Sequence, residues 1–166
     1  MAKHKDEKTN VMRVLDQKKV PYVPHQYAHT EGEAVDGATV AGLIGKDPAA
    51  VFKTLVTRGA AKANYVFVIP VLAELDLKRA ARAVGEKSIE MIHVKELTPL
   101  TGYVRGGCSP LGMKKRLKTV LDSSARGQSA IVVSAGKIGC QVELSPQDLA
   151  GLAGADFAPV TRDAAL

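Results

Sequence analysis

The chain has 166 residues, of which 46% are hydrophobic and 24% are charged, and its formal net charge is +6. We expect residues 1–166 to form one globular domain, and the excess of positive charge favours an acidic partner such as nucleic acid. No apolar run approaches the ~20 residues of a membrane span, and the N-terminus lacks the apolar region of a signal peptide, so we expect a cytoplasmic protein that does not contact a membrane.

The N-terminal part of the chain predicts a tail, a helix and an edge strand. Residues 1–8 are mostly charged and are expected to be disordered. Residues 9–19 combine a capping side chain with apolar residues at helical spacing, which predicts a helix. Residues 20–27 are rich in strand formers but contain two prolines, which predicts an edge strand. Tyr22 and Tyr27 lie in this strand, where each either stacks on a base or packs against the core.

A lysine stands among apolar residues in the next strand. The chain forms a short helix at 36–45 and then a strand at 51–58. Because side chains alternate along a strand, Lys53 shares a face with Val51 and Leu55. Such a lysine either extends to the rim of the protein or faces a ligand in a pocket, and the strand pattern alone leaves both open.

Short strands and short helices alternate through the rest of the chain. The expected strands are 64–70, 88–92, 117–121, 129–134 and 140–144, and the expected helices are 76–84, 93–100 with an interruption near Pro99, and one that begins at Ser145. We expect no element after this last helix. The connections are too short for a regular parallel sheet, so we predict an α+β fold with a mixed, curved, barrel-like sheet surrounded by short helices.

The two cysteines, Cys108 and Cys140, are expected to be free thiols in a reducing compartment. No Cys-x-x-Cys pair is present, and the four histidines are scattered along the sequence. The spacing therefore predicts no metal site.

A glycine loop at residues 106–112 is followed by a basic segment at residues 114–118. Gly106 and Gly107 allow positive φ and close approach of a ligand, and such a loop can direct several N–H groups at one anion. The stretch from Arg105 to Lys118 holds five basic and no acidic side chains. This arrangement suits a phosphate-bearing ligand, although a surface turn followed by a solvated basic segment would have the same sequence.

The order and spacing of these motifs resemble the YbaK/EbsC family of aminoacyl-tRNA deacylases, which is related to the editing domain of bacterial prolyl-tRNA synthetase. The motifs that carry the resemblance are Val51-Phe-Lys-Thr-Leu55, Thr101-Gly-Tyr103, Gly106-Gly-Cys-Ser-Pro-Leu-Gly112 and Ser134-Ala-Gly-Lys137 with Gly139. The resemblance covers roughly residues 9–160 and implies an α/β fold around a curved, barrel-like mixed sheet.

The resemblance also implies which residues form the site. Lys53 would line the aminoacyl pocket and, with Gly106 and Gly107, carry the catalysis. The residues that would bind the substrate are Tyr22, Thr54, Tyr103, Cys108, Ser109, Pro110, Ser134, Gly136 and Lys137. Lys114, Lys115 and Arg116 would contact the tRNA backbone.

The implied activity is hydrolysis of cysteine mischarged on proline tRNA, with possible release from other tRNAs. In this family the thiol of the substrate attacks its own carbonyl, so the protein needs neither a nucleophile nor a cofactor. The implied partners are aminoacyl-tRNA and, in a ternary complex, prolyl-tRNA synthetase. Three alternatives stay open: a deacylase for another amino acid such as Ala-tRNA(Pro), a non-catalytic tRNA-binding module, and a nucleotide-binding regulator. The last is disfavoured because the glycine loop lacks the Gly-Lys-Ser/Thr ending of a P-loop.

Overall fold

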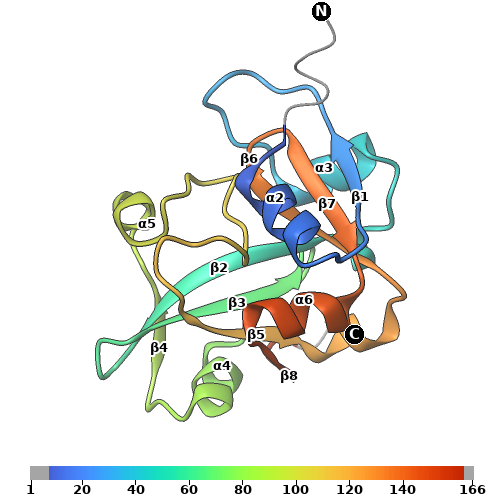
Figure 1. Ribbon diagram of the computed structural model, residues 1–166. Coiled ribbons are helices and arrows are strands. Elements are labelled where there is room, and N and C mark those ends of the chain that lie inside the picture. Colours follow the sequence, from blue (N-terminus) through green and yellow to red (C-terminus); the bar gives the residue numbers. More distant parts are fainter. Residues whose placement is uncertain (1–7, 163–166) are drawn as a thin grey trace, which may run out of the picture.

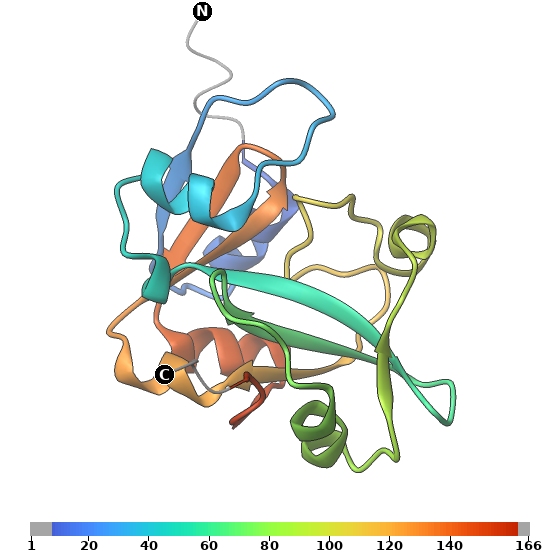
Figure 2. The ribbon, with the colours of Figure 1, turned by 180° about the vertical axis from the view of Figure 1, so that it is seen from behind.

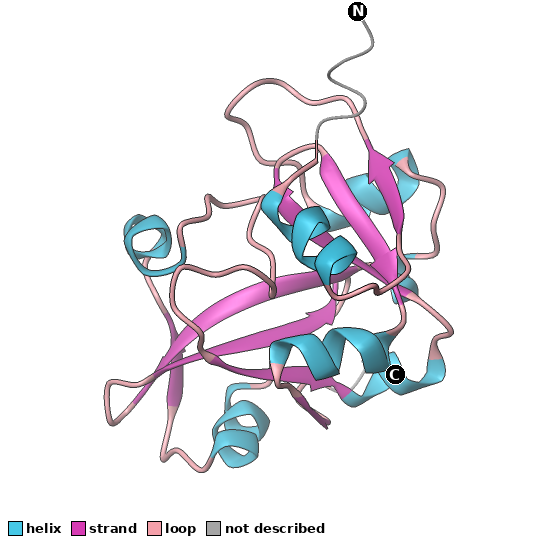
Figure 3. Cartoon of the chain, in the orientation of Figure 1, coloured by secondary structure: helices cyan, strands magenta, loops and turns pink. Residues whose placement is uncertain are grey.

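A computed structural model describes residues 8–162, which form two β-sheets surrounded by short helices (Figures 1 and 3). The strands are β1 (Val23–Gln26), β2 (Phe52–Gly59), β3 (Asn64–Pro70), β4 (Ile89–Met91), β5 (Lys118–Asp122), β6 (Ile131–Lys137), β7 (Cys140–Leu144) and β8 (Asp156–Ala158). The helices are α2 (Asn10–Gln17), α3 (Gly37–Leu43), α4 (Leu77–Val84), α5 (Val94–Thr101) and α6 (Pro146–Ala153), with 3-10 turns η1 (Pro48–Ala50) and η2 (Ser123–Gly127). Part of the tail expected at residues 1–8 lies outside the described residues.

The larger sheet is mixed in direction, as expected from the short connections, and the smaller sheet is antiparallel. One has the order β1-β7-β6 and the other the order β4-β2-β3-β5-β8. The β3–β5 and β5–β8 pairs are parallel, and the remaining pairs are antiparallel. A parallel bridge between Val51 and Val132 links the two sheets, which do not close into one barrel. The expected α+β class with a mixed sheet is therefore confirmed, whereas the barrel-like sheet is two linked sheets.

Apolar side chains are buried on both faces of the larger sheet. Along β3, Val66 and Val68 pack into the main core with α2 and α6, whereas Phe67 and Ile69 face a second core beneath α4. Helices α2 and α6 lie on the near side in Figure 1, and α3 and α4 lie on the side seen in Figure 2. Burial on both faces explains why β3 is almost continuously apolar.

Several helices begin at side-chain caps that lie where the sequence predicts the start of each helix. Thr9, Asp36, Asp76 and Ser145 each accept a hydrogen bond from a backbone N–H in the first turn of the helix that follows. Such a cap satisfies donors that have no partner within the helix. Helix α5 differs from the prediction, because it continues past Pro99 to Thr101.

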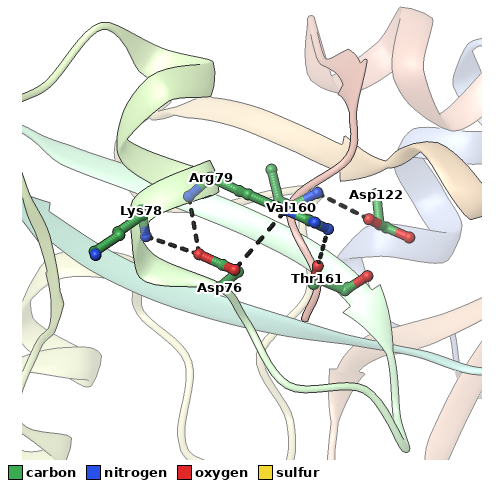
Figure 4. A network of polar contacts seen from close by, with 6 residues as sticks. All are labelled: Asp76, Lys78, Arg79, Asp122, Val160 and Thr161. Carbon is green, nitrogen blue, oxygen red and sulfur yellow. Dashed lines mark hydrogen bonds and ion pairs between the residues drawn. The ribbon is translucent and has the colours of Figure 1, made fainter. Parts of the chain in front are cut away.

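The segment after α6 is also ordered into the fold, contrary to the prediction of no further element. Strand β8 pairs with β5, and the Val160 N–H donates to Asp122 Oδ1 at 3.1 Å. The Asp76 N–H in turn donates to the Val160 carbonyl at 2.8 Å, and Arg79 Nη1 donates to the Thr161 carbonyl at 2.7 Å (Figure 4). These contacts join the C-terminal segment to the start of α4. Within the described part of the chain, no helix is long and apolar enough to cross a membrane.

Candidate active site

An open cleft of about 110 Å³ lies where the two sheets meet. Its lining residues are Tyr27, Val35, Gly37, Val40, Val51, Phe52, Lys53, Thr54, Val71, Gly106, Cys108, Ser134 and Gln141. The structure thus brings together five of the predicted site residues: Lys53, Thr54, Gly106, Cys108 and Ser134. They come from β2, the glycine loop and β6, which are far apart in the sequence.

Lys53 is half-buried at the start of β2, where it pairs in register with Ile69 of β3. Burial lowers the pKa of Lys53, and the carboxylate of Glu74 partly opposes this change. Within residues 8–162, no hydrogen bond or ion pair holds the Lys53 ammonium. Its N–H groups are therefore available to a ligand in the cleft. The strand pattern left open whether Lys53 extends to the rim of the protein or faces a pocket, and the structure favours the second position.

Two hydroxyl groups in the cleft lining are buried without a partner. Neither Tyr27 Oη nor Thr54 Oγ1 forms a hydrogen bond to any described residue. A buried hydroxyl without a partner costs about 1–3 kcal/mol, so such groups call for an explanation. Both hydroxyls belong to residues of the cleft lining, but neither oxygen is accessible from the cleft.

The two glycines of the glycine loop have different surroundings. Gly106 has φ +86°, lines the cleft, and has no described partner for its N–H. The N–H of Gly107, by contrast, donates to the Val104 carbonyl at 2.9 Å. A Cβ on Gly107 would lie 3.0 Å from Ile138 N, so the loop packs directly on the turn between β6 and β7. Of these two N–H groups, that of Gly106 has no described partner and that of Gly107 is already bonded within the loop.

The residues after the glycine pair form a buried wall. Cys108 lines the cleft, and burial raises the pKa of its thiol to about 12, so the thiol is protonated at neutral pH. Ser109 is fully buried, and its Oγ accepts a hydrogen bond from the Leu111 N–H at 3.2 Å. Pro110 is also buried and lines a separate cavity beside α6. Ser109 and Pro110 therefore support the loop and are not part of the cleft lining.

The hairpin between β6 and β7 contributes one predicted residue to the cleft. Ser134 lines the cleft, and its Oγ accepts a hydrogen bond from the Gly136 N–H at 3.1 Å. Gly136 has φ +94° and lies near the end of β6, where the pairing with β7 is irregular, whereas the Lys137 side chain is exposed. Neither Gly136 nor Lys137 is part of the cleft lining.

Two predicted tyrosines lie outside the cleft. Tyr22 is beside Asp16 of α2, and burial, followed by the Asp16 carboxylate, raises the pKa of its hydroxyl. Tyr103 is half-buried behind the glycine loop, where its hydroxyl donates to the Leu111 carbonyl at 2.5 Å. The tyrosine in the cleft lining is instead Tyr27, the other tyrosine of the predicted edge strand.

The sequence interpretation also missed Gln141. This residue pairs with Ser134 across β6 and β7, so the two side chains project from the same face. Alternation along β7 separates Gln141 and Glu143 from the apolar Val142 and Leu144. That polar face was the available signal, but a sequence does not indicate what the face covers.

The basic segment follows the glycine loop on the protein surface. Lys114, Lys115 and Arg116 are all exposed. Lys114 Nζ donates to the Pro99 carbonyl at 3.2 Å, and Arg116 Nη2 donates to the Leu152 carbonyl at 3.4 Å. None of the three lines the cleft, so their expected contact with tRNA would be made outside it.

The cleft can stabilise negative charge but contains no activated nucleophile. Lys53 and the free N–H of Gly106 are positive or partly positive groups suited to a developing oxyanion. The Cys108 thiol is neutral, and no His, Asp or Glu belongs to the lining. Across residues 8–162, no group of three or more His, Cys, Asp and Glu side chains is placed to hold a metal ion.

Comparison with known proteins identifies the family of the chain. A family model described as an aminoacyl-tRNA editing domain matches residues 31–152. A relative from Enterococcus faecalis (strain ATCC 700802 / V583), named as a candidate Cys-tRNA(Pro)/Cys-tRNA(Cys) deacylase EbsC, is 48% identical over 162 residues, which cover 97% of this chain and 98% of the relative.

Solved structures share the fold. A candidate trans-editing enzyme for prolyl tRNA synthetase is 24% identical with a TM-score of 0.77, and the match covers 92% of this chain and 97% of that one. The crystal structure of a hypothetical protein is 22% identical with a TM-score of 0.81 and covers 92% and 99% of the two chains. At these identities the likeness concerns the fold alone.

Proposed function

The chain belongs to the aminoacyl-tRNA editing domain family, and from this premise we propose that it is a deacylase that hydrolyses the ester of cysteinyl-tRNA. The substrates are tRNA(Pro) mischarged with cysteine and Cys-tRNA(Cys), the two named for the Enterococcus relative. The observation that carries the proposal is a partner-free lysine ammonium in a small cleft that contains no activated nucleophile. Such a cleft suits a substrate that supplies its own nucleophile.

In the proposed reaction the thiol sulfur of the bound cysteine attacks its own ester carbonyl. The bond between the carbonyl carbon and the ribose oxygen breaks, and that oxygen leaves with a proton as the free tRNA hydroxyl. Water then opens the resulting cyclic thioester to give cysteine. An aminoacyl ester is already activated, so positioning and oxyanion stabilisation supply the catalysis.

Several residues of the cleft lining contribute to this reaction. Lys53 and the Gly106 N–H stabilise the oxyanion, while Thr54 and Tyr27 line the cleft around the aminoacyl moiety. Cys108 acts only as a small wall residue, because its protonated thiol is a poor nucleophile. A cleft of about 110 Å³ also favours a small side chain such as that of cysteine.

The partner in this function is aminoacyl-tRNA, and we propose that the basic segment binds its phosphates. Lys114, Lys115 and Arg116 are exposed next to the glycine loop and have no carboxylate partner among the described residues. We also propose that the protein acts on tRNA held by prolyl-tRNA synthetase, because a cleft of this size encloses the aminoacyl end and not the rest of the tRNA.

A deacylation panel tests the proposal. Purified full-length protein is incubated with tRNA(Pro) charged with cysteine, alanine or proline and with Cys-tRNA(Cys), each with and without EDTA. We expect rapid release of cysteine from both tRNAs, slow release of alanine and proline, and no effect of EDTA. Preferential release of alanine would support the Ala-tRNA(Pro) alternative, and tight binding without hydrolysis would support a non-catalytic module.

A further inference from the structure

The charges that line the cleft are unfavourable for a substrate with a protonated α-amino group. Among the described residues, Lys53 is the one charged residue that lines the cleft, and no carboxylate lines it. An aminoacyl ester carries an α-amino group, which is positive when protonated. A second positive charge beside Lys53 in a partly desolvated cleft would be unfavourable. The α-amino group must therefore be recognised by a neutral group.

Gln141 has the properties of such a group. Its side chain is only 6% exposed, lines the cleft, and forms no hydrogen bond to any residue in 8–162. Register places it between His25 of β1 and Ser134 of β6. Its amide offers a carbonyl oxygen that accepts hydrogen bonds and carries no net charge. Because no described protein group bonds this amide, it is available to a polar ligand in the cleft.

The carboxylate that lies two residues further along β7 is already bound. Glu143 Oε1 lies 2.8 Å from His25 Nε2 and 3.1 Å from Lys46 Nζ. His25 faces the same side of the sheet as Gln141, but its imidazole is held by Glu143. Glu143 is therefore compensated by two basic groups and does not provide a counter-ion for a substrate ammonium.

The remaining titratable groups around the cleft do not provide one either. Tyr27 and Cys108 also line it, and burial raises the pKa of the Cys108 thiol to about 12, so this group is neutral. Glu74 acts on Lys53 through space but is not part of the lining, and it lies 3.7 Å from the Arg162 guanidinium.

We propose that the side-chain carbonyl of Gln141 accepts a hydrogen bond from the α-amino group of the bound aminoacyl ester in its neutral form, and that Gln141 thereby selects the substrate by the protonation state of its amine. This inference rests on the deacylase function proposed above. At low pH the α-amino group of cysteinyl-tRNA is protonated, and the proposal predicts that this form is excluded from the cleft. An N-acylated cysteinyl ester has no group that can be protonated there, so it should bind at the same pH.

The test compares Cys-tRNA(Pro) with N-acetyl-Cys-tRNA(Pro) that retains a free thiol. The measured quantity is the ratio of their association constants from pH 6 to pH 8, obtained by filter binding before turnover. Binding is used because a free α-amino group, unlike an acetylated one, also changes the ionisation of the attacking thiol and hence kcat/KM. An α-amino group titrates at roughly 7.7–8.0, so the neutral fraction and the wild-type ratio should rise by about tenfold or more over this range. A ratio that is constant or falls with pH overturns the proposal.

Two variants assign the effect to Gln141. Gln141→Glu supplies the missing counter-ion, so its ratio should become flat or fall with rising pH. Gln141→Leu should raise the KM for Cys-tRNA(Pro) several-fold more than the KM for the N-acetyl substrate. Gln147→Glu, an exposed residue of α6, adds the same charge elsewhere and should behave as wild type. If Gln141→Glu has the wild-type pH dependence, the assignment is wrong.

Failure of this inference is distinguishable from failure of the deacylase function. If wild-type protein releases no cysteine at any pH, the proposed function fails and the inference falls with it. If cysteine is released but the ratio does not depend on pH, only the inference about Gln141 fails. Should Gln141→Glu not fold, as judged by its thermal transition, the wild-type ratio still decides whether the amine is taken up in neutral form.

Discussion

The hydroxyl of Tyr103 donates a hydrogen bond of 2.5 Å to the carbonyl oxygen of Leu111 and thereby joins the segment before the glycine loop to the loop itself. Tyr103 also lies against two glycines. A Cβ on Gly112 would be 2.8 Å from the Tyr103 hydroxyl, and one on Gly136 would be 3.0 Å from its ring. Tyr103 therefore packs between the glycine loop and the β6–β7 hairpin, and it acts on the cleft by positioning the loop.

Replacing Tyr103 with Phe tests this positioning role. The change removes the hydrogen bond to Leu111, which should lower the free energy of unfolding by about 1 kcal/mol. It should also lower kcat for Cys-tRNA(Pro), because the loop that carries Gly106 is less well held, with little change in KM. Urea denaturation and steady-state kinetics measure the two effects. Tyr65→Phe, which removes a hydroxyl contact to Glu86 away from the loop, is the control and should leave kcat unchanged.

A methyl group at Gly107 should disturb the site more than the fold. It would lie 3.0 Å from Ile138 N and 3.2 Å from Lys137 C, which are backbone atoms that cannot move independently. Gly107→Ala should therefore displace the loop and lower kcat by tenfold or more, with a moderate loss of stability. Gly151→Ala in α6 meets nothing within 4 Å and should raise stability by about 0.5–1 kcal/mol without changing the kinetics. Equal kcat values for Gly107→Ala and Gly151→Ala would show that close packing of Gly107 on the β6–β7 turn does not matter for catalysis.

The stability of the protein should fall at alkaline pH. Burial raises the pKa of Cys108 and that of Tyr103 to about 12, above their values in an unfolded chain. The unfolded state therefore loses these protons first, so their contribution is fully present below pH ~8.5 and is lost as pH rises toward 12. Urea denaturation at pH 8, 9.5 and 11 measures this fall.

Substitution of Cys108 tests whether its thiol contributes to the loss of stability at alkaline pH. Substitution of both cysteines tests whether a protein thiol takes part in the reaction. Cys108→Ala should reduce the alkaline loss of stability relative to wild type. The double variant Cys108→Ser with Cys140→Ser should retain most of its deacylation activity, because the reacting thiol belongs to the substrate. A folded but inactive double variant would show that a protein thiol participates.

The parts of the fold that local chemistry determines were predictable from the sequence. The caps at Asp36, Asp76 and Ser145 depend on residues within one turn of each other, and the edge strand β1 is marked by Pro24. Strand β8 was not predictable, because three residues carry no periodic signal and the strand depends on its pairing with β5.

The cleft was predictable only where a motif marked it. Lys53 stood out because a strand pattern placed a charge among apolar residues. Tyr27 and Gln141 did not stand out, because their place in the cleft depends on how β1 and β7 pair and on what covers them. Tyr22 and Tyr27 lie in one short segment, and only the tertiary structure distinguishes the tyrosine beside Asp16 from the one in the cleft.

The basic segment should affect binding and not chemistry. Lys114→Ala with Lys115→Ala should raise KM for Cys-tRNA(Pro) and reduce the salt dependence of kcat/KM by about one unit of log–log slope for each lysine. The value of kcat should change little, because neither lysine lines the cleft. Kinetics at several salt concentrations measure both quantities, and an unchanged salt slope would place the tRNA contact elsewhere.

Lys53 is the residue on which the proposed chemistry depends most. Its ammonium has no described partner, and its position in the cleft lining suits contact with the ester oxygen as negative charge develops. Lys53→Ala should remove about 2–4 kcal/mol of transition-state stabilisation, which corresponds to about 30- to 1,000-fold in kcat. Because burial lowers the pKa of Lys53, its charge is unfavourable in the folded state, and Lys53→Met should keep or raise the melting temperature. Lys62→Ala, in the exposed β2–β3 turn, should change neither quantity. Wild-type kcat for Lys53→Ala under saturating Cys-tRNA would remove Lys53 from the mechanism.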